Sequence, residues 1–181
     1  MTCFARVRHT VSPLAAAVIG AAAFLVCVSL ARADNAADGA RIWKEKAGCP
    51  DCHGWAGDGF SSAFHAEGAA PSLRKTQLTR DQIRETIQCG RPGTPMPHFD
   101  RFAYSGDKRC YGLTAEDLGD QKPNRSPVTL QPYEIDAVAD YVASEIKGSG
   151  RVTQEECNDY FGPGRAACGS YPVTASGSSA R

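Results

Sequence analysis

The chain has 181 residues, 20 basic and 20 acidic side chains, and 42% hydrophobic residues. A chain of this size can bury the core of one domain. The whole chain has a formal net charge of zero. Removal of the arginine-bearing N-terminal segment would leave an acidic protein, which argues against a nucleic-acid partner.

Residues 1–33 have the organisation of a secretory signal peptide. Arg6 and Arg8 precede an apolar stretch from Leu14 to Leu30, and Ala31-Arg32-Ala33 offers small residues for cleavage. We therefore predict export to the periplasm. The apolar stretch is long for a signal peptide, so an uncleaved membrane anchor is the alternative, and only then would the protein be bound to a membrane.

Gly39 to Lys46 is predicted as a short helix that carries Trp43 and leads into the sequence Cys49-Pro50-Asp51-Cys52-His53. Two thiols three positions apart, with histidine after the second, are typical of c-type haem attachment. Each thiol adds to one haem vinyl group, and the following imidazole can bind the iron. A zinc site or a redox dithiol is the weaker interpretation, because no second cysteine pair and no βαβ pattern accompany the motif. One motif predicts one haem.

Thr79 to Gln82 forms a capping box, which predicts a helix that buries Ile83 and Ile87 and stops at Gly90. Met96 follows in a loop, and it is the only methionine besides the initiator. Flanking prolines stiffen this loop, which suits a thioether that must be held at the iron. We therefore predict Met96 as the second axial ligand. A core gap-filling role for Met96 is the alternative, and His65 and His98 are the competing ligands.

Residues 97–131 form a long segment in which Thr114 caps one predicted helical turn through Leu118. Pro132 is well placed to begin the last helix. That helix has an amphipathic stripe of Ile135, Val138, Ala139, Val142 and Ile146. Residues 148–181 are rich in glycine, serine and polar residues, and are predicted as an extension.

The chain has eight cysteines, of which Cys3 and Cys27 lie in the predicted signal peptide and Cys49 and Cys52 in the haem motif. The remaining four, Cys89, Cys110, Cys157 and Cys168, predict two disulfides in an exported protein. Four cysteines allow three pairings. Proximity in sequence favours Cys89–Cys110 and Cys157–Cys168.

These features together resemble the class I, or mitochondrial-type, cytochromes c of the bacterial periplasm, over residues 36–100 and 130–147. The resemblance rests on Gly39-x-x-x-Trp43, the attachment motif, Ala70-Pro71-Ser72-Leu73, Met96 and Tyr141. It implies an all-α fold around one mostly buried haem, with the Pro71 carbonyl accepting the His53 ring N–H. The cytochrome domain would span 34–147, with 97–131 as an insertion and 148–181 as a disulfide-stapled extension.

With both axial positions filled, the iron has no open site, so we expect an electron carrier and not an enzyme. The resemblance extends to cytochromes that accept electrons from periplasmic quinoprotein dehydrogenases of methanol or other alcohols and pass them to an oxidase or another cytochrome. A cytochrome subunit of a stable dehydrogenase complex is the alternative, and a haem sensor or enzyme with a displaceable methionine is a third. A positive rim around Met96 is predicted from Arg91, Arg101, Lys108 and Arg109.

Overall fold

The computed structural model describes residues 35–60 and 70–173. The predicted signal peptide, His65 and the end of the extension lie outside these residues. Within the described ranges, no helix has the length and apolar character needed to cross a membrane.

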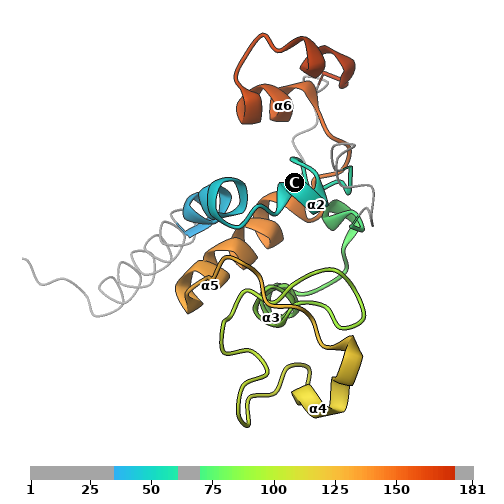
Figure 1. The fold of residues 1–181 in the computed structure, drawn as a ribbon. Helices are drawn as coiled ribbons and strands as arrows, with labels where there is room; N and C mark the ends of the chain where they lie inside the picture. Colours follow the sequence, from blue (N-terminus) through green and yellow to red (C-terminus); the bar gives the residue numbers. More distant parts are fainter. Residues whose placement is uncertain (1–34, 61–69, 174–181) are drawn as a thin grey trace, which may run out of the picture. The chain divides into compact units, whose positions relative to one another are not determined.

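Every regular element in this part of the chain is helical (Figure 1). Residues 35–41 form a helix that continues into the next element. The elements that follow are η1 (Ile42–Lys46), α2 (Pro50–His53), η2 (Leu73–Lys75), α3 (Arg80–Cys89), α4 (Ala115–Leu118), η3 (Gly119–Gln121), α5 (Pro132–Tyr141), η4 (Val142–Ile146), α6 (Gln154–Phe161) and η5 (Ala166–Ser170). The only β-type pairings recorded among the described residues are two isolated bridges. The all-α prediction is therefore confirmed for these residues.

The predicted caps define the ends of the helices. Thr79 accepts a hydrogen bond from the Gln82 backbone N–H, and the Gln82 side chain accepts one from the Thr79 N–H. Gly90 ends α3 with a φ of 67°, a conformation that glycine adopts without strain. Thr114 caps α4 in the same way, and Pro132 is the first residue of α5.

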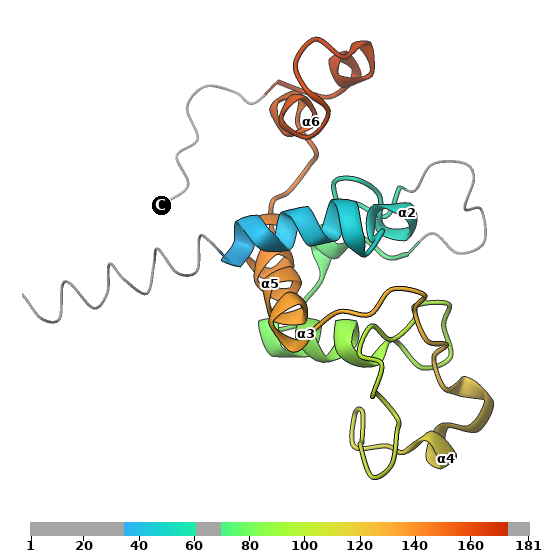
Figure 2. The ribbon, with the colours of Figure 1, turned by 60° about the vertical axis from the view of Figure 1, so that its left-hand side comes forward.

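The main core forms where the N-terminal helix crosses α5, with α3 packed on α5 as well (Figure 2). A Cβ atom on Gly39 would lie 2.1 Å from the Ala137 carbonyl oxygen, so only glycine permits this crossing. The ring centroids of Trp43 and Tyr141 lie 6.1 Å apart beside it. The buried members of the core are Ile42, Trp43, Ile83, Ile87, Phe99, Leu130, Ile135, Ala137, Val138, Ala139, Val142 and Ile146.

The segment 97–131 has a small core of its own. Cys89, Ala103, Tyr104 and Cys110 are buried together, and a disulfide joins Cys89 to Cys110. The first residue of this group belongs to α3, so the disulfide ties the segment to the end of that helix.

The C-terminal extension contains α6 and η5, which the disulfide Cys157–Cys168 joins. The sequence prediction missed α6, although Thr153 and Glu156 form a capping box that signals its start. Arg74 fixes the beginning of the extension, because its buried guanidinium donates to the Gly150 carbonyl at 2.7 Å and to the Glu156 carboxylate at 2.9 Å.

Candidate haem site

The attachment motif forms a single helical turn. Cys49 is the N-cap of α2, Pro50 is its first residue, and the His53 N–H donates to the Cys49 carbonyl at 3.0 Å. Residues three and four positions apart share one face of a helix. The turn therefore presents Cys49, Cys52 and His53 on the same side. Both cysteines are free thiols, whereas the other four described cysteines form disulfides.

Cys49 lacks the lowered pKa of a redox-active thiol. Burial raises the pKa of Cys49 to about 12, and the nearby Cys52 and Asp51 raise it further against a backbone hydrogen bond. A reactive dithiol needs a lowered thiol pKa. In residues 35–60 and 70–173, no group of three or more histidine, cysteine or acidic side chains could hold a metal ion. The dithiol and zinc interpretations therefore find no support in this part of the chain.

His53 is half-buried, and its Nδ1 atom is buried without a hydrogen-bond partner among the described residues. Burial lowers the pKa of His53. The nearby Pro71 carbonyl acts in the opposite direction and raises that pKa, although it does not complete a hydrogen bond to Nδ1. A neutral imidazole is the form that binds a metal. The Trp43 ring lies 6.0 Å from the imidazole, between centroids, and forms part of the apolar surroundings.

Close backbone packing brings Pro71 to His53. The Gly59 N–H donates to the His53 carbonyl at 2.9 Å, and the Leu73 N–H donates to the Gly57 carbonyl at 2.8 Å. A Cβ on Gly59 would lie 2.6 Å from the Ala70 carbonyl oxygen, so glycine is needed where the two segments meet. The loop after the histidine thus positions the proline segment that was predicted to orient the ring.

Met96 lies half-buried in a tight loop just after α3. The Arg91 N–H donates to the Met96 carbonyl at 3.2 Å, and Thr94 Oγ1 accepts from the Met96 N–H at 3.3 Å. His98, a competing ligand, is buried, and its Nδ1 lies 2.8 Å from the Asp100 carbonyl oxygen. Its ring also meets Tyr104 edge-on at 5.8 Å. These contacts leave the other ring nitrogen, Nε2, as the atom through which His98 would compete with Met96.

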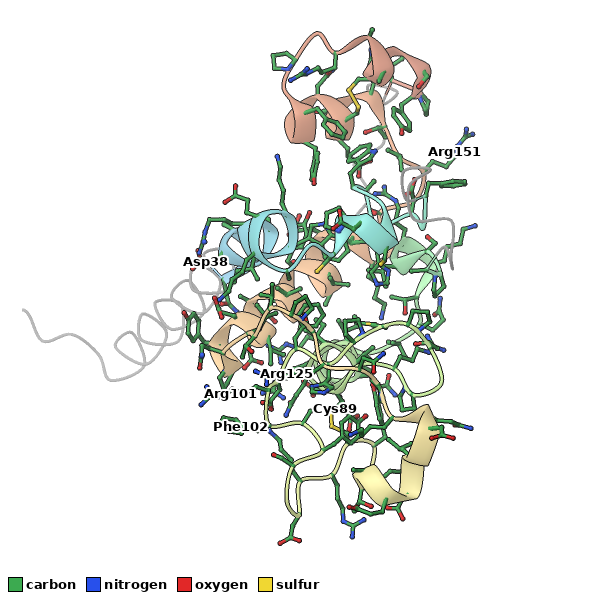
Figure 3. All side chains as sticks on the ribbon, in the orientation of Figure 1. Asp38, Cys89, Arg101, Phe102, Arg125 and Arg151 are labelled. Carbon is green, nitrogen blue, oxygen red and sulfur yellow. A yellow bond between two sulfur atoms is a disulfide. The ribbon has the colours of Figure 1, made fainter. Side chains whose placement is uncertain are left out.

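The predicted positive rim is only partly free. Lys108 forms an ion pair with Asp100, and Arg109 lies 3.7 Å from Asp117. Arg91 and Arg101 are exposed and have no ion pair recorded in the described part of the chain. Figure 3 shows Arg101 and Phe102 together, and the guanidinium carbon lies 4.4 Å from the ring centroid. The rim is therefore reduced to these two arginines.

A separate cavity of about 360 Å³ lies between the extension and the core. Its lining includes Trp55, Arg74, Tyr141 and Tyr160 but none of Cys49, Cys52, His53 or Met96. It is therefore not part of the haem site.

The residues present fit a covalently attached haem. Two free thiols and an imidazole share one helical face, and the buried His53 Nδ1 lies beside the Pro71 carbonyl, which can accept a hydrogen bond from the ring N–H. Thioether-forming cysteines and an imidazole are the donor set of haem c.

Residues 34–110 match the family model described as "Cytochrome C oxidase, cbb3-type, subunit III". The matched range contains the attachment motif, Pro71 and Met96. Searches of curated proteins and of solved structures found no match. The match and the helical fold support a c-type cytochrome, a class of protein that binds haem covalently, transfers electrons and has redox proteins as its partners.

Proposed function

We propose that the protein is a periplasmic one-electron carrier with a single haem c attached through Cys49 and Cys52 and ligated by His53 and Met96. The observation that carries this proposal is the single turn α2, which presents two free thiols and a half-buried imidazole on one face.

The bound haem supplies a centre that takes up and releases one electron. Pro71 would orient His53 by accepting its ring N–H, and that hydrogen bond would raise the basicity of the ring nitrogen that is to hold the iron. The hydrogen-bonded loop around Met96 holds the thioether in place. If His53 and Met96 both held the iron of a bound haem, the site would offer no place for a substrate, and the buried surroundings of Trp43 would favour the less charged ferrous state.

Export agrees with the disulfides, which persist in oxidising compartments. The proposed electron donor is a periplasmic dehydrogenase of the quinoprotein alcohol type, and the acceptor is a terminal oxidase or another cytochrome. Transient redox contacts bury little surface. The exposed Arg91 and Arg101 beside the Met96 loop give such a contact a local positive charge.

A cytochrome subunit of a stable complex is the second candidate. The matched family is described as a subunit of an oxidase, and the stapled extension adds surface beyond the matched residues. Gel filtration of the native protein separates the two, since a carrier elutes as a small protein and a subunit elutes with its complex. A sensor with a displaceable methionine would instead bind carbon monoxide when reduced.

Covalent attachment and one-electron chemistry test the proposal together. The protein is produced in a periplasm with haem-attachment machinery, denatured, and examined for haem that stays with the polypeptide. We expect retained haem in the native sequence, weaker retention in Cys52→Ala, and a redox titration that follows a single one-electron step. Haem that dissociates from the native sequence on denaturation would refute the attachment.

A further inference from the structure

The segment that follows Met96 in sequence returns to lie beside the Met96 loop. The Gly93 N–H donates to the Gln121 carbonyl at 2.8 Å, and the His98 N–H donates to the Asn124 carbonyl at 3.0 Å. The Ser126 N–H completes the contact by donating to the His98 carbonyl at 2.9 Å. Residues 121–126 therefore hold the loop on both sides of the proposed ligand.

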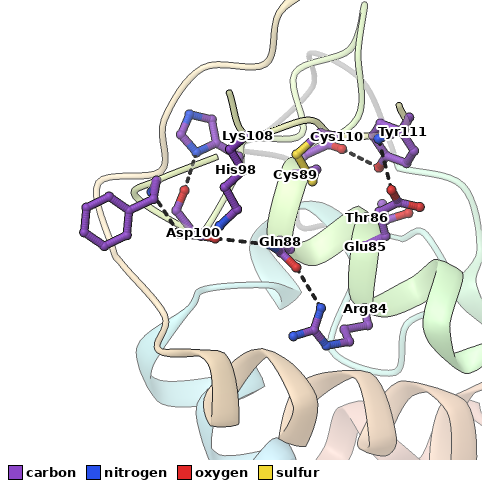
Figure 4. The surroundings of a disulfide bond; sticks show 12 residues. Arg84, Glu85, Thr86, Gln88, Cys89, His98, Asp100, Lys108, Cys110 and Tyr111 are labelled. Atoms are coloured by element: carbon purple, nitrogen blue, oxygen red, sulfur yellow. Dashed lines mark hydrogen bonds and ion pairs between the residues drawn. A yellow bond between two sulfur atoms is a disulfide. The ribbon is translucent and has the colours of Figure 1, made fainter. Parts of the chain in front are cut away.

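A second set of contacts anchors the same insertion to the end of α3 (Figure 4). The Tyr111 hydroxyl donates to the Gly90 carbonyl at 2.7 Å, and the Tyr111 N–H donates to Glu85 Oε1 at 3.0 Å. The neighbouring disulfide Cys89–Cys110 fixes this point covalently. Gly90 thus connects the helix, the insertion and the start of the Met96 loop.

The atoms around Gly90 leave no room for a side chain. A Cβ atom there would lie 2.7 Å from Pro123 Cβ, 2.8 Å from the His98 nitrogen and 2.8 Å from the Met96 carbonyl oxygen. Gly90 consequently packs directly against both the insertion and the Met96 loop.

Two residues near the Cys89–Cys110 disulfide have unfavourable backbone conformations. Tyr104 has a φ of 61° and Tyr111 a φ of 56°. Positive φ angles of this size are energetically unfavourable for a bulky residue. Such conformations persist where the surrounding structure determines them strongly, and they cluster at functional sites. Both tyrosines lie close to Cys110 in sequence, on the two sides of it.

We propose that the 97–131 insertion is a clamp for the Met96 loop, and that Tyr111 and the Cys89–Cys110 disulfide are its positioning residues. The clamp keeps the thioether at the iron and makes its displacement by other ligands unfavourable. The proposal rests on the proposed ligation by His53 and Met96. A thioether is a weak ligand, so the free energy of opening the loop decides how readily another molecule replaces it.

Imidazole is the probe, because it binds ferric haem only after Met96 leaves the iron. Its affinity for the oxidised holoprotein is measured by optical titration in matched variants. Tyr111→Phe removes the hydroxyl that binds Gly90, whereas Tyr104→Phe removes a buried hydroxyl that has no hydrogen-bond partner among the described residues. We expect Tyr111→Phe to raise imidazole affinity about fivefold, the factor that corresponds to one net hydrogen bond. Tyr104→Phe is expected to leave the affinity unchanged.

The two disulfides provide a second matched pair. Removing Cys89–Cys110 with alanines should raise imidazole affinity by about tenfold or more, because the bond restrains the opened loop. Removing Cys157–Cys168 in the same way should leave it unchanged, since that disulfide lies in the extension.

The outcomes separate the two proposals. If the oxidised native protein shows no methionine-to-iron charge-transfer band, the proposed ligation fails, whatever the variants do. If the band is present but Tyr111→Phe binds imidazole as weakly as the native protein and as Tyr104→Phe, the clamp is wrong. Should the alanine variant of Cys89–Cys110 not fold, the tyrosine pair alone decides.

Discussion

Replacing Gly39 with alanine tests the helix crossing on which the haem site is built. The new Cβ would lie 2.1 Å from the Ala137 carbonyl oxygen and 2.7 Å from Tyr141 Cβ. Ordinary non-bonded contacts are about 3.5 Å or longer, so the N-terminal helix and α5 must separate by roughly 1 Å. The crossing is therefore expected to loosen along its length.

The expected change in the free energy of unfolding is the difference between two opposed contributions. Overpacking of a well-packed core costs about 1–3 kcal/mol, and contact with a backbone atom that cannot rotate away places this site near the upper end. Alanine recovers up to about 1 kcal/mol through its higher helix propensity. We therefore expect Gly39→Ala to lower the free energy of unfolding by ~2 kcal/mol.

Guanidinium chloride unfolding of the holoprotein, followed by far-ultraviolet circular dichroism, measures this loss. Gly169→Ala is the matched control, because a Cβ there meets nothing within 4 Å and its φ is not positive. The control should unfold like the native protein. A Gly39→Ala variant as stable as the control would refute the close crossing.

Three further changes probe the extension and the surface. Arg74→Met should reduce the hydrogen-exchange protection of α6 by about 1–2 kcal/mol, because the Gly150 and Ala56 carbonyls lose their donor, whereas Glu156 keeps its hydrogen bond from the Thr153 N–H. An α6 that exchanges as slowly as before would contradict this link. Breaking Cys157–Cys168 with alanines should cost about 2–3 kcal/mol in the same measurement, and equal protection in the alanine variant and the native protein would be the contrary result. Arg91→Glu should slow reduction by a quinoprotein alcohol dehydrogenase, and the loss should shrink at high salt; reduction as fast as in the native protein would remove this arginine from the docking surface.

Features whose cause is local in sequence could be predicted. The capping boxes at Thr79 and Thr114 each involve a residue three positions further on, so they identify the starts of α3 and α4 directly. The attachment motif is equally local, since one helical turn brings its thiols and imidazole together. The same kind of signal at Thr153 would have revealed α6, but the glycine-rich and serine-rich composition of the extension obscured it.

Features that depend on distant segments could not be predicted. The backbone of residues 121–126 supports the Met96 loop through carbonyl and N–H groups, which leave no trace in side-chain periodicity. Arg74 would be expected at the surface. It is buried instead, because backbone carbonyls and one acid from the extension surround it. The pairing of Lys108 with Asp100 likewise depends on the path of an irregular loop.

Ligation of the iron by Met96 is the central claim, and the absorption spectrum of the oxidised holoprotein tests it most directly. The native protein should show the weak red methionine-to-iron charge-transfer band near neutral pH. Met96→Ala should lose that band and still retain its haem after denaturation. A native protein without the band, and with the spectrum of bis-histidine ligation, would contradict the account.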